Sequence, residues 1–187
     1  MMTTIFDIND GNTLKEVASL LKMGKVGVLP CDTIYGLSAL ANEKSEERIY
    51  EIKRRPKAKN FITLMTKEQA ISTFDIPKAI VNSWPAPLTA IVKGEDEKTH
   101  AIRVPNDNFI LSLLEETGPL WSTSVNFSGS PSLLTFEEIY KTFSPLVDFI
   151  VRKEDILSSS LPSTIIDCTV HPFKLVRMGA FDASSLI

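Results

Sequence analysis

Histidine and cysteine are scarce in this sequence of 187 residues, which has two of each. His100 and His171 stand alone, and Cys31 and Cys168 form no CxxC pair. Sites for zinc and similar metals need several such ligands at short spacing, so we expect no metal site built from protein ligands. A framework of disulfides is equally unexpected, and a reducing compartment such as the cytoplasm suits this cysteine content.

Long hydrophobic runs are also absent. No apolar stretch reaches the roughly 18 residues that a membrane-spanning helix needs. The first residues, from Met1 to Asp7, lack the basic start and the apolar centre of a secretory signal. We therefore expect a cytoplasmic protein with no membrane partner.

The short motifs of several large enzyme classes are missing. The sequence has no GxxxxGKS/T phosphate loop, no GxGxxG dinucleotide motif, no GxSxG nucleophile elbow and no HExxH zinc motif. These absences argue against a phosphate-loop nucleotidase, a dinucleotide-binding oxidoreductase, an esterase of the elbow type and a zinc protease.

The composition is that of a globular protein, with 43% hydrophobic and 23% charged residues and a net charge of −3. No linker or repeat divides the chain, so we expect a single domain over residues 1–187. Helices and strands are mixed but do not alternate strictly, and several strands are too close in sequence for a helical crossover. An α/β fold with a partly antiparallel sheet is therefore predicted.

Helix starts are marked by three sequences of the capping-box type, which begin at Thr13, Thr66 and Thr135. Ser45 is predicted to cap a further helix, and Pro77 to start another. Strands are expected over residues 26–29, 61–65, 88–92, 101–105, 120–124, 146–151, 163–167 and 174–177.

A basic corner, defined as residues 53–59, has five cationic residues out of seven although the chain as a whole is acidic. Pro56 prevents a helix from continuing and favours an extended Arg55, so the corner is expected where a helix runs into a loop. Alone, such a run is either a solvated charged surface or a site for a polyphosphate or carboxylate.

Polar residues recur at strand ends elsewhere: Asp32-Thr33, Arg103, the segment 124–129, Ser163-Thr164 and Arg177. Arg103 interrupts a strand, which is typical either of an edge position facing water or of an anion site. Asp32 and Asp167 are candidates for catalysis or for turn capping. Together these segments predict a concave site that binds anions and has no pair of nucleophile and base.

Seven segments, in order along the chain, resemble motifs of the YrdC-like domain family. They are Pro30–Leu37 (P-T-D-T-x-Y-G-L), Lys53–Pro56 (K-x-R-P), Pro85–Thr89 (P-G-P-x-T), Arg103–Pro105 (R-x-P), Ser124–Gly129 (S-A-N-x-S-G), Ser163–Asp167 (S-T-V/I-V/I-D) and Arg177–Gly179 (R-x-G). The length resembles that of the short form. The resemblance implies an open, twisted α/β sheet with helices on both faces around a positively charged groove.

The resemblance also implies an activity. Threonylcarbamoyl-AMP synthases of this family are nucleotidyltransferases that combine L-threonine, bicarbonate and ATP, with Mg²⁺, and supply the machinery that makes t6A in tRNA. Position by position, it implies that Lys53 and Arg55 are catalytic. It assigns threonine binding to Thr33, Arg103, Ser124 and Ser163, and ATP binding to Arg55, Lys59, Thr99, Asn126 and Arg177.

Some positions differ from the family pattern, namely Cys31, Leu64, Ala86 and Leu134. The run 60–65 resembles YciO-type paralogues, which leaves open an alternative: a module that binds transfer RNA or double-stranded RNA without threonine-dependent catalysis. A third hypothesis is a carbamoyl-adenylate enzyme that uses another amino acid or carbamoyl phosphate, similar to relatives in hydrogenase maturation.

Overall fold

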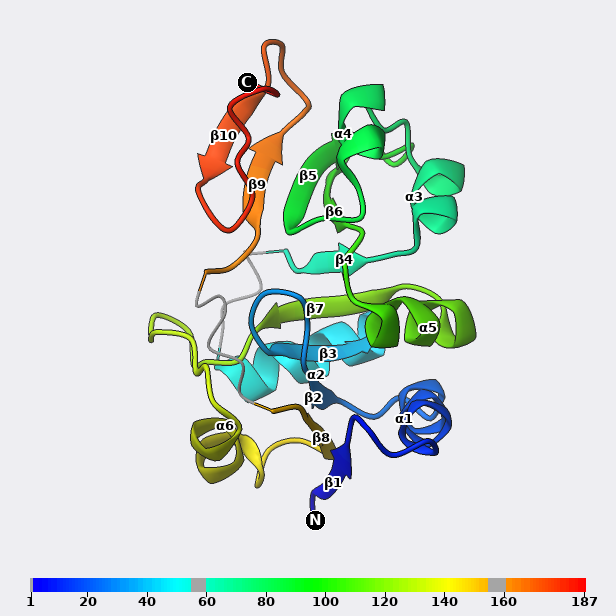
Figure 1. Ribbon diagram of the computed structural model, residues 1–187, viewed down its shortest axis with the longest axis vertical. Coiled ribbons are helices and arrows are strands. Elements are labelled where there is room, and N and C mark those ends of the chain that lie inside the picture. Colours follow the sequence, from blue (N-terminus) through cyan, green and yellow to red (C-terminus); the bar gives the residue numbers. More distant parts are fainter. Residues whose placement is uncertain (1, 55–59, 155–160) are drawn as a thin grey trace.

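The computed structural model describes residues 2–54, 60–154 and 161–187. Within those ranges the chain forms ten strands and six helices (Figure 1). The strands are β1 (Thr4–Asp7), β2 (Gly27–Leu29), β3 (Gly36–Leu40), β4 (Ile62–Leu64), β5 (Leu88–Lys93), β6 (Thr99–Arg103), β7 (Leu120–Ser124), β8 (Phe149–Arg152), β9 (Thr164–Asp167) and β10 (Lys174–Arg177). The helices are α1 (Thr13–Lys22), α2 (Glu43–Lys53), α3 (Lys67–Thr73), α4 (Lys78–Ser83), α5 (Asn108–Thr117) and α6 (Phe136–Phe143).

All ten strands belong to one open sheet in the order β1-β8-β2-β3-β7-β4-β6-β5-β9-β10. Four neighbouring pairs are parallel, namely β1–β8, β2–β8, β4–β6 and β5–β9, and the other neighbours are antiparallel. The predicted mixed sheet is confirmed. The order also places β6 between β4 and β5, so the interpretation of Arg103 as an edge residue facing water is wrong.

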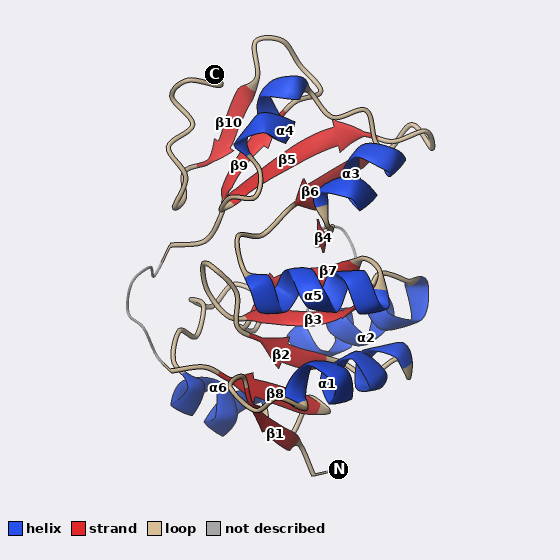
Figure 2. Ribbon diagram, turned by 45° about the vertical axis from the view of Figure 1, so that its right-hand side comes forward, coloured by secondary structure: helices blue, strands red, loops and turns tan. Residues whose placement is uncertain are grey.

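Helices cover both faces of the sheet (Figure 2). In β8, Ile150 packs with residues of α2 and α6, whereas its neighbours Phe149 and Val151 pack with residues of α1 and α5. Successive strand residues point to opposite faces, so this alternation buries both faces at once. A third cluster packs α3 and α4 against β5, β6 and β9.

Two of the predicted capping boxes are confirmed, at Thr66 with Gln69 and at Thr135 with Glu138. The one predicted at Thr13 is wrong, because Asn12 occupies the cap position and the Thr13 hydroxyl donates to the Asp7 carbonyl. The predicted cap at Ser45 is also wrong. Asn42 caps α2 and accepts from the Ser45 amide, which places Ser45 inside the first turn.

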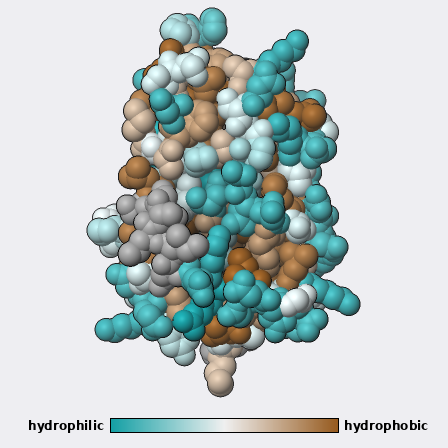
Figure 3. Space-filling view, in the orientation of Figure 1, coloured by the Kyte–Doolittle hydropathy of each residue, from teal (hydrophilic) through white to brown (hydrophobic). Residues whose placement is uncertain are grey.

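The surface seen in Figure 3 is largely hydrophilic, with hydrophobic residues in several places, one of them over β9 and β10. Val176 and Met178, in and just after β10, are exposed. In the part of the chain that the structure describes, no helix has the length and the apolar character needed to cross a membrane.

Candidate functional site

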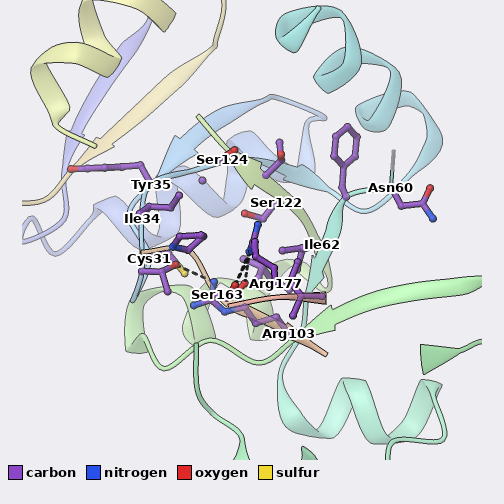
Figure 4. A pocket seen from close by; sticks show the side chains of 17 residues that line it. Cys31, Ile34, Tyr35, Asn60, Ile62, Arg103, Ser122, Ser124, Ser163 and Arg177 are labelled. Carbon is purple, nitrogen blue, oxygen red and sulfur yellow. Dashed lines mark hydrogen bonds between the residues drawn. The ribbon is translucent and has the colours of Figure 1, made fainter. Parts of the chain in front are cut away.

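A pocket of about 260 Å³ lies where the ends of several central strands meet (Figure 4). Its lining comes from five parts of the chain: the turn between β2 and β3, residues 60–64, the end of β6, the end of β7, and residues 162–177. The charged residues of the lining are Arg103 and Arg177, and none of the described lining residues is acidic. This lining suits an anion.

Arg103 is the last residue of β6 and is 5% exposed. Its Nη1 donates to the Thr33 hydroxyl at 3.1 Å, and its Nη2 donates to the carboxylate of Asp32. Its buried Nε has no hydrogen-bond partner within the described residues. A buried guanidinium with an unused donor is expected where a ligand completes the bonding.

Asp32 and Cys31 are bonded to each other next to Arg103. The Asp32 carboxylate also accepts from the Asn106 amide at 3.0 Å, and the Cys31 thiol donates to it at 3.0 Å. Burial, together with the negative charge of Asp32, raises the pKa of the Cys31 thiol to about 12 against the opposing effect of Arg103. Cys31 is therefore a protonated donor in this pocket and not a nucleophile.

Arg177, at the end of β10, forms a wall of the pocket together with Ser163. Its Nε and Nη2 donate to the Ser163 carbonyl at 3.1 and 2.7 Å, and Nη2 also donates to the Ser163 hydroxyl at 3.2 Å. The Ser163 hydroxyl is in turn 2.8 Å from that of the buried Thr89. Burial lowers the pKa of Arg177, and repulsion by the charge of Arg103 lowers it further. The two cations thus act on the same space.

Lys53 lies behind the pocket and does not line it. Its ammonium, in a residue that is 2% exposed, donates to the Ser124 carbonyl (2.5 Å), the Asn126 carbonyl (3.0 Å) and Asn126 Oδ1 (2.7 Å). The Ser128 amide donates to the Lys53 carbonyl at 3.0 Å, and the Arg54 guanidinium lies over the Phe127 ring. The end of α2 therefore holds the segment 124–128 in place.

The hydroxyls of the pocket differ in whether they can still donate or accept a hydrogen bond. Thr33 accepts from Arg103, which leaves its own proton for an acceptor. Ser124 donates its proton to Asn126 Oδ1 at 2.8 Å, which leaves its lone pairs for a donor. One side of the pocket therefore offers hydrogen-bond donors and the other offers an acceptor.

The structure brings together five of the predicted site residues, because Thr33, Arg103, Ser124, Ser163 and Arg177 all line this pocket. Lys53 and Asn126 contact Ser124 from outside the lining. Arg55 and Lys59 lie outside the described residues.

The remaining predicted site residue, Thr99, lies at the start of β6, is exposed and does not line the pocket. Of the positions that differ from the family pattern, Cys31 and Leu64 line the pocket, whereas Ala86 and Leu134 do not.

Gly36 and Thr89 belong to the matched motifs but no role was predicted for them, and Ser122 was not singled out at all. Gly36 pairs with Ser124 in the register of β3 and β7, and a Cβ at residue 36 would lie 2.6 Å from the Ser122 hydroxyl oxygen. The signal for Ser122 was its spacing of two from Ser124, which puts both on one face of β7.

Comparisons with known proteins agree with this architecture. Residues 19–179 match the Sua5/YciO/YrdC family, described as "Telomere recombination". A Vibrio vulnificus threonylcarbamoyl-AMP synthase is 29% identical over 90% of this chain and 99% of its own length. A Methanocaldococcus jannaschii protein, provisionally given the same name, is 32% identical over 97% of this chain and 94% of its own.

Two solved structures are also similar to this chain. E. coli YciO superposes with a TM-score of 0.88 at 26% identity, over the whole of both chains. The complex of P. abyssi Sua5 with L-threonine superposes with a TM-score of 0.88 at 25% identity, over 99% of this chain and 59% of that one.

Proposed function

Because the chain belongs to the Sua5/YciO/YrdC family, we propose that it is a threonylcarbamoyl-AMP synthase, a nucleotidyltransferase that joins L-threonine, bicarbonate and ATP. The products are threonylcarbamoyl-adenylate and pyrophosphate, and the adenylate supplies the machinery that forms t6A in tRNA. The observation that carries the proposal is the pocket itself. Residues from Thr33 to Arg177, distant in sequence, line one space with two guanidinium groups.

The hydrogen-bond polarity of the pocket suits an amino acid. Its carboxylate needs donors, which Arg103 and the Thr33 proton supply, and its amine needs an acceptor, which the lone pairs of Ser124 supply. The volume of about 260 Å³ fits a ligand of this size, because pockets for drug-sized ligands begin at roughly 300 Å³. A nucleotide would extend beyond the described pocket.

The reaction places three anionic groups side by side. The deprotonated threonine amine takes up bicarbonate carbon with loss of water to give a carbamate, and a carbamate oxygen then attacks the α-phosphorus of ATP and displaces pyrophosphate. The repulsion among carboxylate, carbamate and phosphates is offset by fixed cations, and Arg103 and Arg177 are placed to provide part of this. Positioning and charge are then sufficient without a dedicated protein base.

Mg²⁺ would accompany the phosphates of ATP and stabilise the charge on departing pyrophosphate. The described residues contain no cluster of three or more histidine, cysteine, aspartate or glutamate side chains that could hold a metal. This donor set fits a metal brought in by the nucleotide and held mainly by phosphate oxygens and water.

The RNA-binding alternative uses the basic corner. Of its two described cations, Lys53 is 2% exposed and bonded to the segment 124–126, whereas Arg54 is exposed and lies over the Phe127 ring. RNA binding based on charge needs cations that reach phosphates, and it weakens steeply as salt is raised.

The test is pyrophosphate release with ATP, Mg²⁺ and labelled bicarbonate in the presence of each amino acid in turn. We expect release that depends on L-threonine. Removing a charged contact costs about 1.5–3 kcal/mol, roughly tenfold to more than a hundredfold in rate or affinity. Arg103→Ala and Arg55→Ala should therefore each lower threonine-dependent turnover by about tenfold to more than a hundredfold.

Arg48→Ala is the matched control, because Arg48 is an exposed residue of α2 paired with Glu51 at 3.2 Å. It should keep turnover within about twofold of the wild type. Wild-type turnover in Arg103→Ala would contradict the proposal. Salt-sensitive RNA binding without any threonine-dependent release would support the alternative instead.

A further inference from the structure

Asp32 is the one carboxylate bonded to the guanidinium of Arg103 in the described part of the chain. The side chains of this ion pair are 9% and 6% exposed, respectively. None of the roles given above to the threonine or the ATP site involves Asp32. Its burial beside a cation of the pocket therefore needs a separate explanation.

The position of Asp32 in the fold is unusual. It follows β2, whereas Arg103 ends β6, and β3, β7 and β4 lie between those two strands in the sheet. With about 4.8 Å between neighbouring strands, roughly 19 Å separates β2 from β6, and the turn after β2 spans this distance together with the side chains of Asp32 and Arg103. Asp32 anchors this turn, because its carboxylate accepts hydrogen bonds from both Arg103 and the Asn106 amide.

The contacts of Arg103 leave a defined set of donors. A guanidinium has five N–H groups, and the bonds to Asp32 and Thr33 use one on Nη2 and one on Nη1. The Nε group is buried and has no partner among the described residues. The guanidinium is thus held at two points, with further N–H groups left for a ligand.

We propose that Asp32 is a positioning residue that fixes the Arg103 guanidinium, and with it the Thr33 hydroxyl, in the orientation that receives the carboxylate of the amino-acid substrate. The identity of that carboxylate rests on the proposed function. Asp32 acts through Arg103 and does not itself touch the substrate. The negative charge of Asp32 also offsets the cost of burying the guanidinium when no substrate is bound.

A purely structural role is the competing explanation. Buried ion pairs add little net stability compared with apolar residues of the same volume, so stability alone is a weak reason for this one. The two roles predict different kinetic changes. If Asp32 only stabilises the fold, its loss lowers the fraction of folded protein and reduces turnover with all substrates alike. If Asp32 positions Arg103, its loss raises the KM for threonine selectively.

Asp32→Asn keeps the side-chain shape and removes the charge. Asp148→Asn is the matched control, because Asp148 also accepts from one cation, Lys25 at 3.3 Å, and from one backbone amide, that of Val26 at 3.0 Å, and it does not line the pocket.

In steady-state pyrophosphate release, Asp32→Asn should raise the KM for threonine about tenfold or more, the loss expected when a charge-assisted contact is misaligned. The KM for ATP should stay within about threefold. Asp148→Asn should leave both within about twofold.

A double-variant cycle tests whether Asp32 acts through Arg103. In an Arg103→Lys background, adding Asp32→Asn should change the KM for threonine by less than about twofold, because the group that Asp32 positions is already gone. The proposal is overturned if Asp32→Asn alone behaves like Asp148→Asn. It is equally overturned if the full tenfold loss persists in the Arg103→Lys background.

A second readout does not depend on turnover. In ¹⁵N side-chain NMR, a guanidinium held at two points should give separate Nη signals for Arg103, and Asp32→Asn should merge them while Asp148→Asn should not. If the wild type shows no threonine-dependent turnover, the proposed function fails, and this spectrum still decides the role of Asp32. Unchanged Arg103 signals in Asp32→Asn would refute the positioning role.

If Asp32→Asn does not fold, as judged by circular dichroism, Asp32→Glu replaces it in both assays. This variant keeps the charge and moves it by one methylene. A selective rise in the KM for threonine supports the proposal, and a wild-type KM contradicts it.

Discussion

Replacing Lys53 by methionine would separate two roles for this buried lysine. Methionine has a similar length and no charge, so the space stays filled. The change removes the ammonium that donates to the carbonyl groups of Ser124 and Asn126 and to Asn126 Oδ1. Asn126 Oδ1 keeps the donor supplied by the Ser124 hydroxyl, so the two carbonyl oxygens lose most.

The expected loss of stability follows from opposing effects. A buried acceptor left without a donor costs about 1–3 kcal/mol, and two are affected. Taking an ammonium out of the interior returns part of its desolvation cost, which is several kcal/mol for a buried ion. We therefore expect a net loss of about 2 kcal/mol in the free energy of unfolding, with the Ser124 hydroxyl displaced and kcat/KM for threonine reduced at least about tenfold.

Urea unfolding followed by circular dichroism measures the first effect, and pyrophosphate release measures the second. Lys22→Met is the control, because Lys22 is an exposed residue of α1 that reaches Glu116 at 3.5 Å. This control should unfold within about 0.5 kcal/mol of the wild type.

Wild-type unfolding of Lys53→Met would show that the ammonium does not hold the segment 124–126. If such a stable variant were also inactive, Lys53 would act on the substrates directly, as the family resemblance implies.

Three further predictions concern single positions. Gly36→Ala should raise the KM for threonine about tenfold, because its Cβ would lie 2.6 Å from the Ser122 hydroxyl oxygen; an unchanged KM would show that Ser122 can turn away freely. With the pKa of Cys31 raised to about 12, its thiolate fraction at pH 8 is on the order of 10⁻⁴. Alkylation by iodoacetamide, followed by mass spectrometry, should therefore be much slower than in the urea-unfolded chain and should still rise tenfold per pH unit between pH 8 and 10, whereas equal rates would mean that the thiol is accessible. Thr135→Ala removes the side chain that accepts from the Glu138 amide and should cost about 1 kcal/mol in urea unfolding; a smaller change than about 0.3 kcal/mol would show that α6 does not depend on this cap.

Local signals in the sequence predicted many elements well. The capping boxes at Thr66 and Thr135 are confirmed because each bond joins residues three apart, and nothing from elsewhere in the fold competes. At Thr13 a contact from outside the helix decided the outcome, since its hydroxyl bonds the Asp7 carbonyl. At Ser45 the helix begins earlier, because Asn42 is an equally good cap three residues before.

Two strands could not be predicted from local patterns. Strand β3 consists of Gly36-Leu37-Ser38-Ala39-Leu40, whose small residues have low strand propensity. It forms because β2 and β7 pair with both of its edges. Strand β1 is largely exposed and pairs with β8, whose residues are about 145 positions later in the chain. No pattern within a few residues can specify such a partner.

The candidate site was likewise predictable only in part. Motif order identified five residues that line the pocket, but motifs do not state which groups bond one another. The link between Asp32 and Arg103 joins positions that are 71 apart, and the sequence alone left Asp32 open between catalysis and turn capping. The buried setting of Lys53 was likewise invisible, because a run of cations is typical of exposed surface.

The wall formed by Ser163 and Arg177 has a consequence for protein synthesis. This wall comes from the last strands, and Gly179 lies so close to the Pro162 carbonyl that a larger residue would not fit. A nascent chain that has been translated only as far as β9 already carries most of the core, yet one side of its pocket does not exist. Ribosome-bound or prematurely terminated products that stop before β10 would therefore lack this wall, and in a cell-free translation mixture the complete pocket would be present only in chains that extend through β10.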